Sequence, residues 1–162
     1  MTIKNFKSKK VKPDKLVTKP ILVADYMITK VITFTPDQTM LSVMDTLVRK
    51  KISGGPVVND KNELVGIISE RDCLRKIANN RYFNVPLGSA KVEQFMIKEV
   101  ETISQNTNIF DAVNLFLKKR KRRFPVIHNG KLVGQVSQRE ILKAALTINS
   151  KQTENKFSFN LF

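Results

Sequence analysis

The sequence contains few residues of the kinds that build catalytic or metal centres. Its 162 residues include one cysteine, Cys73, and one histidine, His128. A single cysteine excludes an internal disulfide framework and a cysteine-based zinc cluster. A single histidine leaves little basis for a catalytic triad or a histidine-bound metal. The sequence shows no nucleophile–base pair and no carboxylate dyad. We therefore expect a protein that is not an enzyme and has neither a catalytic cofactor nor a metal.

Long apolar runs are also lacking. The longest runs span only a few residues, which is too short to cross a bilayer. The first ten residues, MTIKNFKSKK, contain no apolar stretch of the signal-peptide type. We therefore expect a cytoplasmic location with no membrane contact. The hydrophobic fraction of 41% is still sufficient for a packed core.

The positive charge of the chain is concentrated in two segments. Of the net charge of +15, residues 1–20 contribute seven lysines against one aspartate, and the run 118–123 (KKRKRR) contributes six cations. The segment 21–117 carries eleven basic and eleven acidic residues. An excess that is not spread over one face weakens the interpretation as a nucleic-acid binder.

The segments that begin at Val23 and Val92 are copies of one another. Four matching pairs share an offset of 69 residues: Met27 with Met96, Val31 with Val100, Thr33 with Thr102, and Pro56 with Pro125. Two later pairs share an offset of 68: Gly66 with Gly134, and Ser69 with Ser137. The change of offset predicts a turn that is one residue shorter in the second copy. Register kept over this length indicates duplication of one structural unit.

Each copy has the same order of predicted elements. An extended piece (31–34 and 100–103) precedes an amphipathic helix, for which Thr39 and Asn108 are suitable N-caps. A hairpin follows, and Asn129-Gly130 is typical of a type I′ turn. A second helix (70–77 and 138–146) closes the copy. Because a unit of about 50 residues buries little core alone, we predict an α+β fold of two β-α-β-β-α repeats about a pseudo-twofold axis.

The copies also set the expected boundaries. We expect a basic, flexible arm at 1–20, a first repeat at 21–80, a connector at 81–91, a second repeat at 92–146 and a polar tail at 147–162. Residues 1–20 and 148–162 are polar and lack sustained periodicity, so we expect both segments to be poorly ordered.

The two copies resemble the CBS family, named after cystathionine β-synthase. The resemblance covers about residues 21–145 and rests on several short motifs: the D-Y-M and Q-F-M openings, the V-x-T strands, the P-V-[VI] strands, and the closing motifs GIISERD (66–72) and GQVSQRE (134–140). It implies that the repeat pair forms one Bateman module, that modules associate as homodimers, and that the clefts hold AMP, ADP, ATP or a related ligand. Other family members bind S-adenosylmethionine, NAD or metal ions. The second closing motif ends in Glu140, where the family prefers aspartate.

Each closing motif places a serine three residues before an acid at the expected start of a helix. Ser69 with Asp72, and Ser137 with Glu140, fit a capping box in which the acid accepts a hydrogen bond from the serine amide. The functional interpretation is that the serine and the free helix amides bind a phosphate. Within the resemblance, the carboxylate of Asp72 would then hold ribose hydroxyls. Both interpretations stay open.

The basic run 118–123 has three interpretations. Its lysines fit the solvated C-terminal end of a helix. Arg122 and Arg123 lie where the family often places a phosphate-binding residue, whereas residues 53 and 54 of the first copy offer no cation. A phosphate between the repeats would then meet one of these arginines and Ser69. The third interpretation is a nucleic-acid patch, which no nearby aromatic motif supports.

The remaining candidates depend on the resemblance. The two V-x-T threonines match the strand that meets the adenosine, and neighbouring apolar residues would form either a slot for the base or ordinary core. The complete set of candidate nucleotide-binding residues is Ile32, Thr33, Pro56, Ser69, Arg71, Asp72, Thr102, Arg122, Arg123, Phe124, Pro125, Ser137, Arg139 and Glu140.

Together these features predict a non-catalytic regulatory module. It would sense an adenine nucleotide between its repeats and signal to a separate, unidentified effector protein. Two alternatives stay open. One is nucleic-acid or polyanion binding through the arm and the run 118–123. The other is a ligand-free structural dimerisation module.

Overall fold

The computed structural model describes residues 20–83 and 88–158. Most of the expected arm, residues 84–87 of the connector and residues 159–162 of the tail lie outside the described residues. The elements of the first copy are η1 (Val23–Asp25), α1 (Met40–Lys50), β1 (Gly54–Val58), β2 (Leu64–Ser69) and α2 (Glu70–Phe83). Those of the second copy are η2 (Val92–Gln94), β3 (Ile103–Ser104), α3 (Ile109–Lys119), β4 (Arg123–His128), β5 (Lys131–Ser137) and α4 (Gln138–Ser158). The fold is α+β, as predicted, and η1 and η2 are short 3-10 helices.

The two hairpins match each other in register. Both are antiparallel, and Gly54 pairs with Ser69 in the first as Arg123 pairs with Ser137 in the second. Val58 pairs with Leu64, whereas Ile127 pairs with Leu132, so the second turn is one residue shorter, as the change of offset predicted. Asn129 and Gly130 both have positive φ, 48° and 77°, which confirms the type I′ turn.

The first helix of each copy is capped as expected. The Thr39 side chain accepts a hydrogen bond from the Ser42 amide at 3.2 Å, and the Asn108 side chain accepts one from the Phe110 amide at 2.9 Å. Each helix ends at a residue in the left-handed conformation, Lys51 in α1 and Arg120 in α3. The extended pieces differ between the copies. Ile103–Ser104 forms a parallel strand with β4, whereas only Phe34 of 31–34 forms a β-bridge, with Val57.

The second helices are longer than the apolar pattern predicted. α2 continues from residue 77 to Phe83, and α4 continues from residue 146 to Ser158. α4 therefore includes residues 148–158, which belong to the segment expected to be poorly ordered. Neither extension contains proline or glycine, the residues that most strongly stop a helix, so the backbone continues beyond the apolar stripe.

The leading segments of the two copies are exchanged. Val23 of η1 lies in the core with Ile103, Phe116 and Phe124 of the second copy. Val92 of η2 lies in the core with Phe34 and other residues of the first copy. Backbone hydrogen bonds join Ile28 to Gln135 and Ile97 to Ile67 in both directions. Each core is thus completed by the other copy, which gives the reciprocal arrangement expected of a pseudo-twofold axis.

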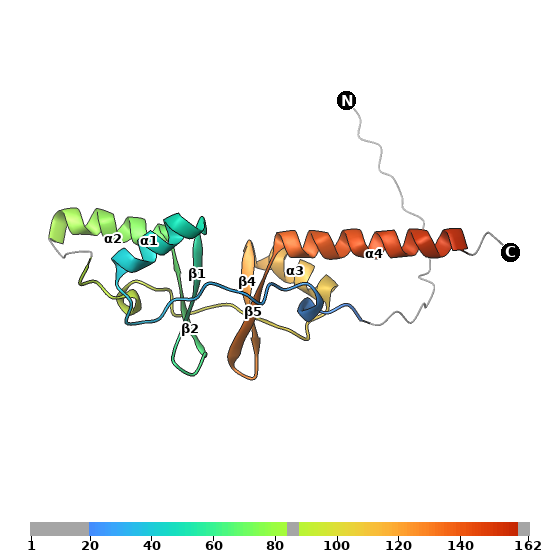
Figure 1. Cartoon of the computed structure of the whole chain (residues 1–162), viewed down its shortest axis with the longest axis horizontal. Coiled ribbons are helices and arrows are strands. Elements are labelled where there is room, and N and C mark those ends of the chain that lie inside the picture. The colour runs from blue at the N-terminus through green and yellow to red at the C-terminus, as the bar shows by residue number, and fades with distance from the viewer. Residues whose placement is uncertain (1–19, 84–87, 159–162) are drawn as a thin grey trace, which may run out of the picture.

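The hairpins β1–β2 and β4–β5 lie next to each other in the middle of the molecule, with α1 and α2 on one side and α3 and α4 on the other (Figure 1). The hairpin turns also touch, because the Leu132 amide donates to the Asn62 carbonyl and the Asn62 side chain donates to the Leu132 carbonyl. This arrangement brings the ends of both hairpins, and the starts of α2 and α4, to the boundary between the copies.

Candidate functional site

A cleft of about 440 Å³ lies between the two copies. Pockets for small ligands usually have volumes of roughly 300–1,000 Å³, so a nucleotide is an appropriate size of occupant. The first copy lines it with Ser53, Gly54, Gly55, Pro56, Ile67, Ser69, Glu70 and Arg71. The second copy lines it with Ile97, Glu99, Val100, Glu101, Arg120, Lys121, Arg122, Arg123, Pro125 and Gln135.

One wall of the cleft is the start of α2. Ser69 ends β2 and Arg71 lies in the first turn of α2, where free backbone amides and the helix dipole favour an anion. Asp72 accepts hydrogen bonds from both the amide and the hydroxyl of Ser69, at 3.0 and 2.5 Å. Its side chain is 3% exposed and does not line the cleft. The capping-box interpretation of Ser69 and Asp72 therefore describes this structure. Both of these bonds go to Oδ2, and the other carboxylate oxygen, Oδ1, lies 3.7 Å from the Arg75 guanidinium.

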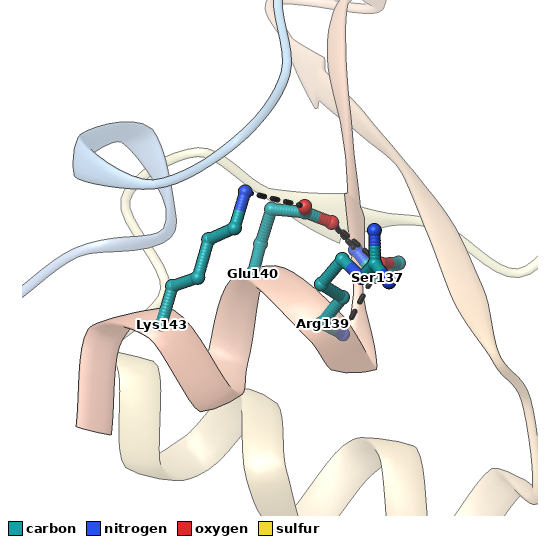
Figure 2. Close-up of polar contacts among 4 residues, drawn as sticks. All are labelled: Ser137, Arg139, Glu140 and Lys143. Atoms are coloured by element: carbon teal, nitrogen blue, oxygen red, sulfur yellow. Dashed lines mark hydrogen bonds and ion pairs between the residues drawn. The ribbon is translucent and has the colours of Figure 1, made fainter. Parts of the chain in front are cut away.

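The start of α4 repeats this geometry. Glu140 accepts hydrogen bonds from the Ser137 amide and hydroxyl, at 3.1 and 2.5 Å, and its other oxygen lies 3.8 Å from the Lys143 ammonium (Figure 2). Glu140 is 4% exposed. The extra methylene of glutamate has not prevented the cap. Ser137, Arg139 and Glu140 are not among the residues that line the cleft.

The second copy contributes residues 120–123 of the basic run to the cleft lining. Lys118 and Lys119 belong to α3, Arg120 is its C-cap, and Arg123 begins β4. The interpretation of the lysines as a helix end holds for Lys118 and Lys119. Lys121 directly follows the C-cap, and it lines the cleft. Arg122 and Arg123 also line the cleft, so the structure brings them to the same cavity as Ser69 and Arg71, as the phosphate hypothesis required.

The segment between the helix end and α4 is held by the backbone. The amide of Gln138 donates to the carbonyl of Arg122 at 3.1 Å, and its side chain donates to the carbonyl of Lys121 at 3.0 Å. These bonds fix the position from which the two arginines extend. Both arginine side chains are exposed, so solvent or a ligand can reach them.

The other candidates are distributed around the boundary. Pro56 and Pro125 line the cleft, whereas Phe124 lies in the core with its ring 4.9 Å from that of Phe116. Phe124 is therefore a core residue and does not form part of a slot for the base. Three more candidates do not line the cleft: Ile32 and Thr33, which are exposed, and Thr102, which is half-buried.

Four residues of the segment 97–101 line the cleft but were not predicted: Ile97, Glu99, Val100 and Glu101. They lie in the cleft because two backbone hydrogen bonds between Ile97 and Ile67 hold this segment of the second copy against the first copy. Glu101 lies there within 2.6 Å of the Lys119 ammonium and 3.8 Å of that of Lys121. The hydrogen bond from Lys119 is the main cause that lowers the pKa of Glu101. The only sequence feature that could have identified this segment is the match of Met27 to Met96, because the same offset of 69 residues makes 97–101 equivalent to 28–32 of the first copy.

Residues able to hold a metal are not gathered anywhere in the described part of the chain, where no group of three or more His, Cys, Asp or Glu residues is found. Cys73 is buried in the first core, and burial raises the pKa of its thiol to about 11. Among the described helices, none is both long enough and apolar enough to cross a membrane.

The pattern of the CBS domain family matches residues 23–79 and 92–147 of this sequence. The chain belongs to the CBS domain family. The two matched stretches are the two copies, and they cover most of the described residues.

Relatives and solved structures of CBS proteins agree with this assignment. The chain is 34% identical over 125 residues to an uncharacterized 17.7 kDa protein of Acidianus ambivalens, covering 76% of this chain and 73% of that protein. It is 26% identical to MJ1225 of Methanocaldococcus jannaschii, covering 82% of this chain but only 47% of that protein. A crystal structure of CBSX2 in complex with AMP is similar, with a TM-score of 0.69 and 30% identity over 79% of this chain and 98% of that one. CBSX2 is a CBS-pair protein of Arabidopsis thaliana.

Proposed function

We propose that this chain is a non-catalytic sensor that binds an adenine nucleotide, AMP, ADP or ATP, in the cleft between its CBS repeats. One observation carries the proposal. Ser69 and Arg71 at the start of α2 line the same cavity as Arg122 and Arg123 of the other repeat. A helix start and two guanidinium groups are the groups proteins use to bind phosphate.

The apolar part of the cleft suits the base. Pro56, Pro125 and Ile67 line it beside the polar groups, a mixture of surfaces that is typical of small-molecule sites. Support also comes from the AMP complex of CBSX2, which shares 30% identity with this chain and has a similar fold. Adenine nucleotides form an intracellular pool, so the proposal includes a cytoplasmic location.

Signalling would follow from the position of the cleft. A ligand that contacts both repeats favours one relative geometry by its difference in affinity between geometries. A separate effector protein would respond to that geometry. The proposal also includes a homodimer, because all four long helices expose large apolar side chains: Leu41, Val48, Leu74, Ile77, Phe110, Leu117, Leu142 and Leu146.

A thermal-shift and calorimetric titration with AMP, ADP and ATP tests the proposal. At a hundredfold excess over the dissociation constant, a ligand that binds only the native state should stabilise it by about 2.7 kcal/mol. The variant R122Q/R123Q should lose most of this shift. The matched control is Arg49→Gln, since Arg49 is exposed on α1, pairs with Asp45 and lies outside the cleft. Equal ligand-induced stabilisation of R122Q/R123Q and Arg49→Gln would contradict the proposal. No stabilisation of the wild type by any of the three nucleotides would also contradict it.

A further inference from the structure

A second hollow adjoins the candidate cleft. It has a volume of about 570 Å³ and is lined by Glu99, Val100, Glu101, Lys118, Lys119 and Lys121. Four of these residues, Glu99, Val100, Glu101 and Lys121, also line the cleft. The two spaces therefore share a wall, and a ligand that fills the cleft is close to the lysines of the hollow.

Glu101 lies where the two spaces meet. Its carboxylate accepts a hydrogen bond from Lys119 at 2.6 Å and lies 3.8 Å from the ammonium of Lys121. The lysine contacts lower the pKa of Glu101, so the carboxylate is ionised at neutral pH. The chain thus already holds one anionic group against two cations of the hollow.

Positive charge dominates the joined spaces. Seven Lys or Arg residues and three Glu residues line them. A single phosphate near Ser69, Arg122 and Arg123 would leave the joined spaces with a net positive charge. A longer chain of phosphates would bring further negative charge toward Lys119 and Lys121.

The arrangement occurs only once in the duplicated sequence. At the offset of 69 residues, Lys50 corresponds to Lys119, but Ile52 corresponds to Lys121 and Ile32 to Glu101. The first repeat therefore lacks both the acid and the second lysine. This difference makes the two sides of the module chemically unequal although their folds match.

We propose that the cleft and the adjoining hollow form one extended anion site that prefers a nucleoside triphosphate to a monophosphate. In this proposal Lys119 and Lys121 create the preference and Glu101 limits it, because the carboxylate occupies both lysines until the outer phosphates of the ligand displace it. A monophosphate bound beside Ser69, Arg122 and Arg123 does not extend into the hollow, and it leaves the pair of Glu101 with Lys119 intact. The inference rests on the proposed function and specifies its ligand class.

Calorimetric titration of the full chain with AMP, ADP, ATP and inorganic triphosphate, in the presence of a metal chelator, tests this. Wild type should bind ATP more tightly than AMP. Glu101→Gln should strengthen ATP binding by about two- to fivefold, the range expected for removing an exposed competing ion pair, and strengthen AMP binding by a smaller factor. Lys119→Gln should weaken ATP binding by about threefold or more and change AMP binding by less than about twofold.

Two controls match these charge changes. Glu93→Gln removes an exposed carboxylate outside both spaces, and Lys50→Gln removes the counterpart of Lys119 in the first repeat. Neither should alter the ratio of ATP to AMP affinity. Thermal melting without ligand should give wild-type transitions for all four variants.

The outcomes separate this inference from the proposed function. If AMP and ATP bind with equal affinity, or if Lys119→Gln weakens AMP and ATP binding equally, the inferred preference for a triphosphate is overturned. The proposed function as a nucleotide sensor then still stands. Inorganic triphosphate that binds as tightly as ATP overturns the nucleotide part of the inference in favour of a polyphosphate site. A complete lack of binding by all three nucleotides overturns the proposed function, and the inference with it.

Discussion

Gly134 lies against the carbonyl oxygen of Ile28, and a Cβ at this position would be 2.8 Å from that oxygen and 2.9 Å from the sulfur of Met27. Gly66 has the corresponding neighbours in the other copy, Met96 sulfur at 2.5 Å and Ile97 carbonyl oxygen at 3.1 Å. The glycines of the two closing motifs thus make room for the exchanged leading segments. The methionines of the two opening motifs are the side chains that occupy this room.

We expect Gly134→Ala to reduce the free energy of unfolding by about 1–3 kcal/mol, because the added methyl group must displace backbone that is itself hydrogen-bonded to Gln135. Gly66→Ala should cost less, since its shortest contact is with a flexible methionine side chain. Urea denaturation measures both values. Gly88→Ala is the control, because its Cβ would meet no atom within 4 Å. If Gly134→Ala reduced the free energy of unfolding by no more than Gly88→Ala does, the packing argument would be contradicted.

The same contacts show what the sequence could and could not predict about the fold. Offsets, caps and turn residues act locally, so the order of elements, the Thr39 and Asn108 caps and the shorter second turn were all predictable. The exchange of the leading segments was not predictable, because the apolar character of Val23 and Val92 indicates that they are buried but not which copy buries them. The extensions of α2 and α4 were missed because an apolar stripe marks where a helix packs, not where its backbone ends.

The structure gathers part of the predicted set of binding residues around one cleft, whereas Ser137, Arg139 and Glu140 do not line it. Ser69, Arg71, Arg122 and Arg123 belong to recognisable motifs, and the structure gathers them around one cleft. The segment 97–101 has no such motif and reaches the cleft only through the exchange. The part of the hypothesis that assigned Asp72 to a ribose depended on the resemblance, and in this structure the carboxylate caps its own helix.

Substitution of Asp72 should therefore affect folding as well as binding. We expect Asp72→Ala to cost about 1–2 kcal/mol of stability without ligand, since both the amide and the hydroxyl of Ser69 lose their acceptor. Chemical denaturation of the ligand-free chain measures this. Glu70→Ala, an exposed acid in the same helical turn, should cost less than about 1 kcal/mol. Similar losses for the two variants would indicate that the cap contributes little.

Cys73 should be chemically inert in the folded chain. Its thiol is buried and its pKa is raised from 9.0 to about 11, mainly by burial and next by the charge of Asp72. At about pH 8 the reactive thiolate is then on the order of one molecule in a thousand. Mass spectrometry after treatment with iodoacetamide should show an unmodified native chain and a modified denatured one. Rapid alkylation of the native chain would show that the α2 region opens readily.

The same shift sets the direction of a pH effect on stability. A thiol whose pKa is raised on folding keeps its proton in the folded state while the unfolded chain ionises. Its contribution to stability is therefore fully present below about pH 9 and is lost as the pH rises toward 11. Denaturation midpoints of the wild type should fall over this window by more than those of Cys73→Ser, in which the titrating group is absent.

The exposed apolar side chains on the helices predict a dimer. Leu117 of α3 and Leu146 of α4 are 71% and 72% exposed, so their replacement by glutamate should change the stability of a single chain by only about 0.5 kcal/mol each. In a dimer the same residues would place charges in an apolar interface, where unpaired charge is strongly unfavourable. We expect L117E/L146E to be monomeric by light scattering at concentrations where the wild type is dimeric.

The control for this experiment is Asn106→Glu, which introduces the same charge at an exposed position outside the helices. It should leave the dimer intact. Because dimerisation depends on concentration, the comparison must cover a series of dilutions rather than one sample. A wild-type chain that stays monomeric throughout would mean that these helical faces are covered by another protein or remain open. A dimer unaffected by L117E/L146E would place the interface on other residues, beginning with Leu41, Val48, Leu74 and Ile77 of the first repeat.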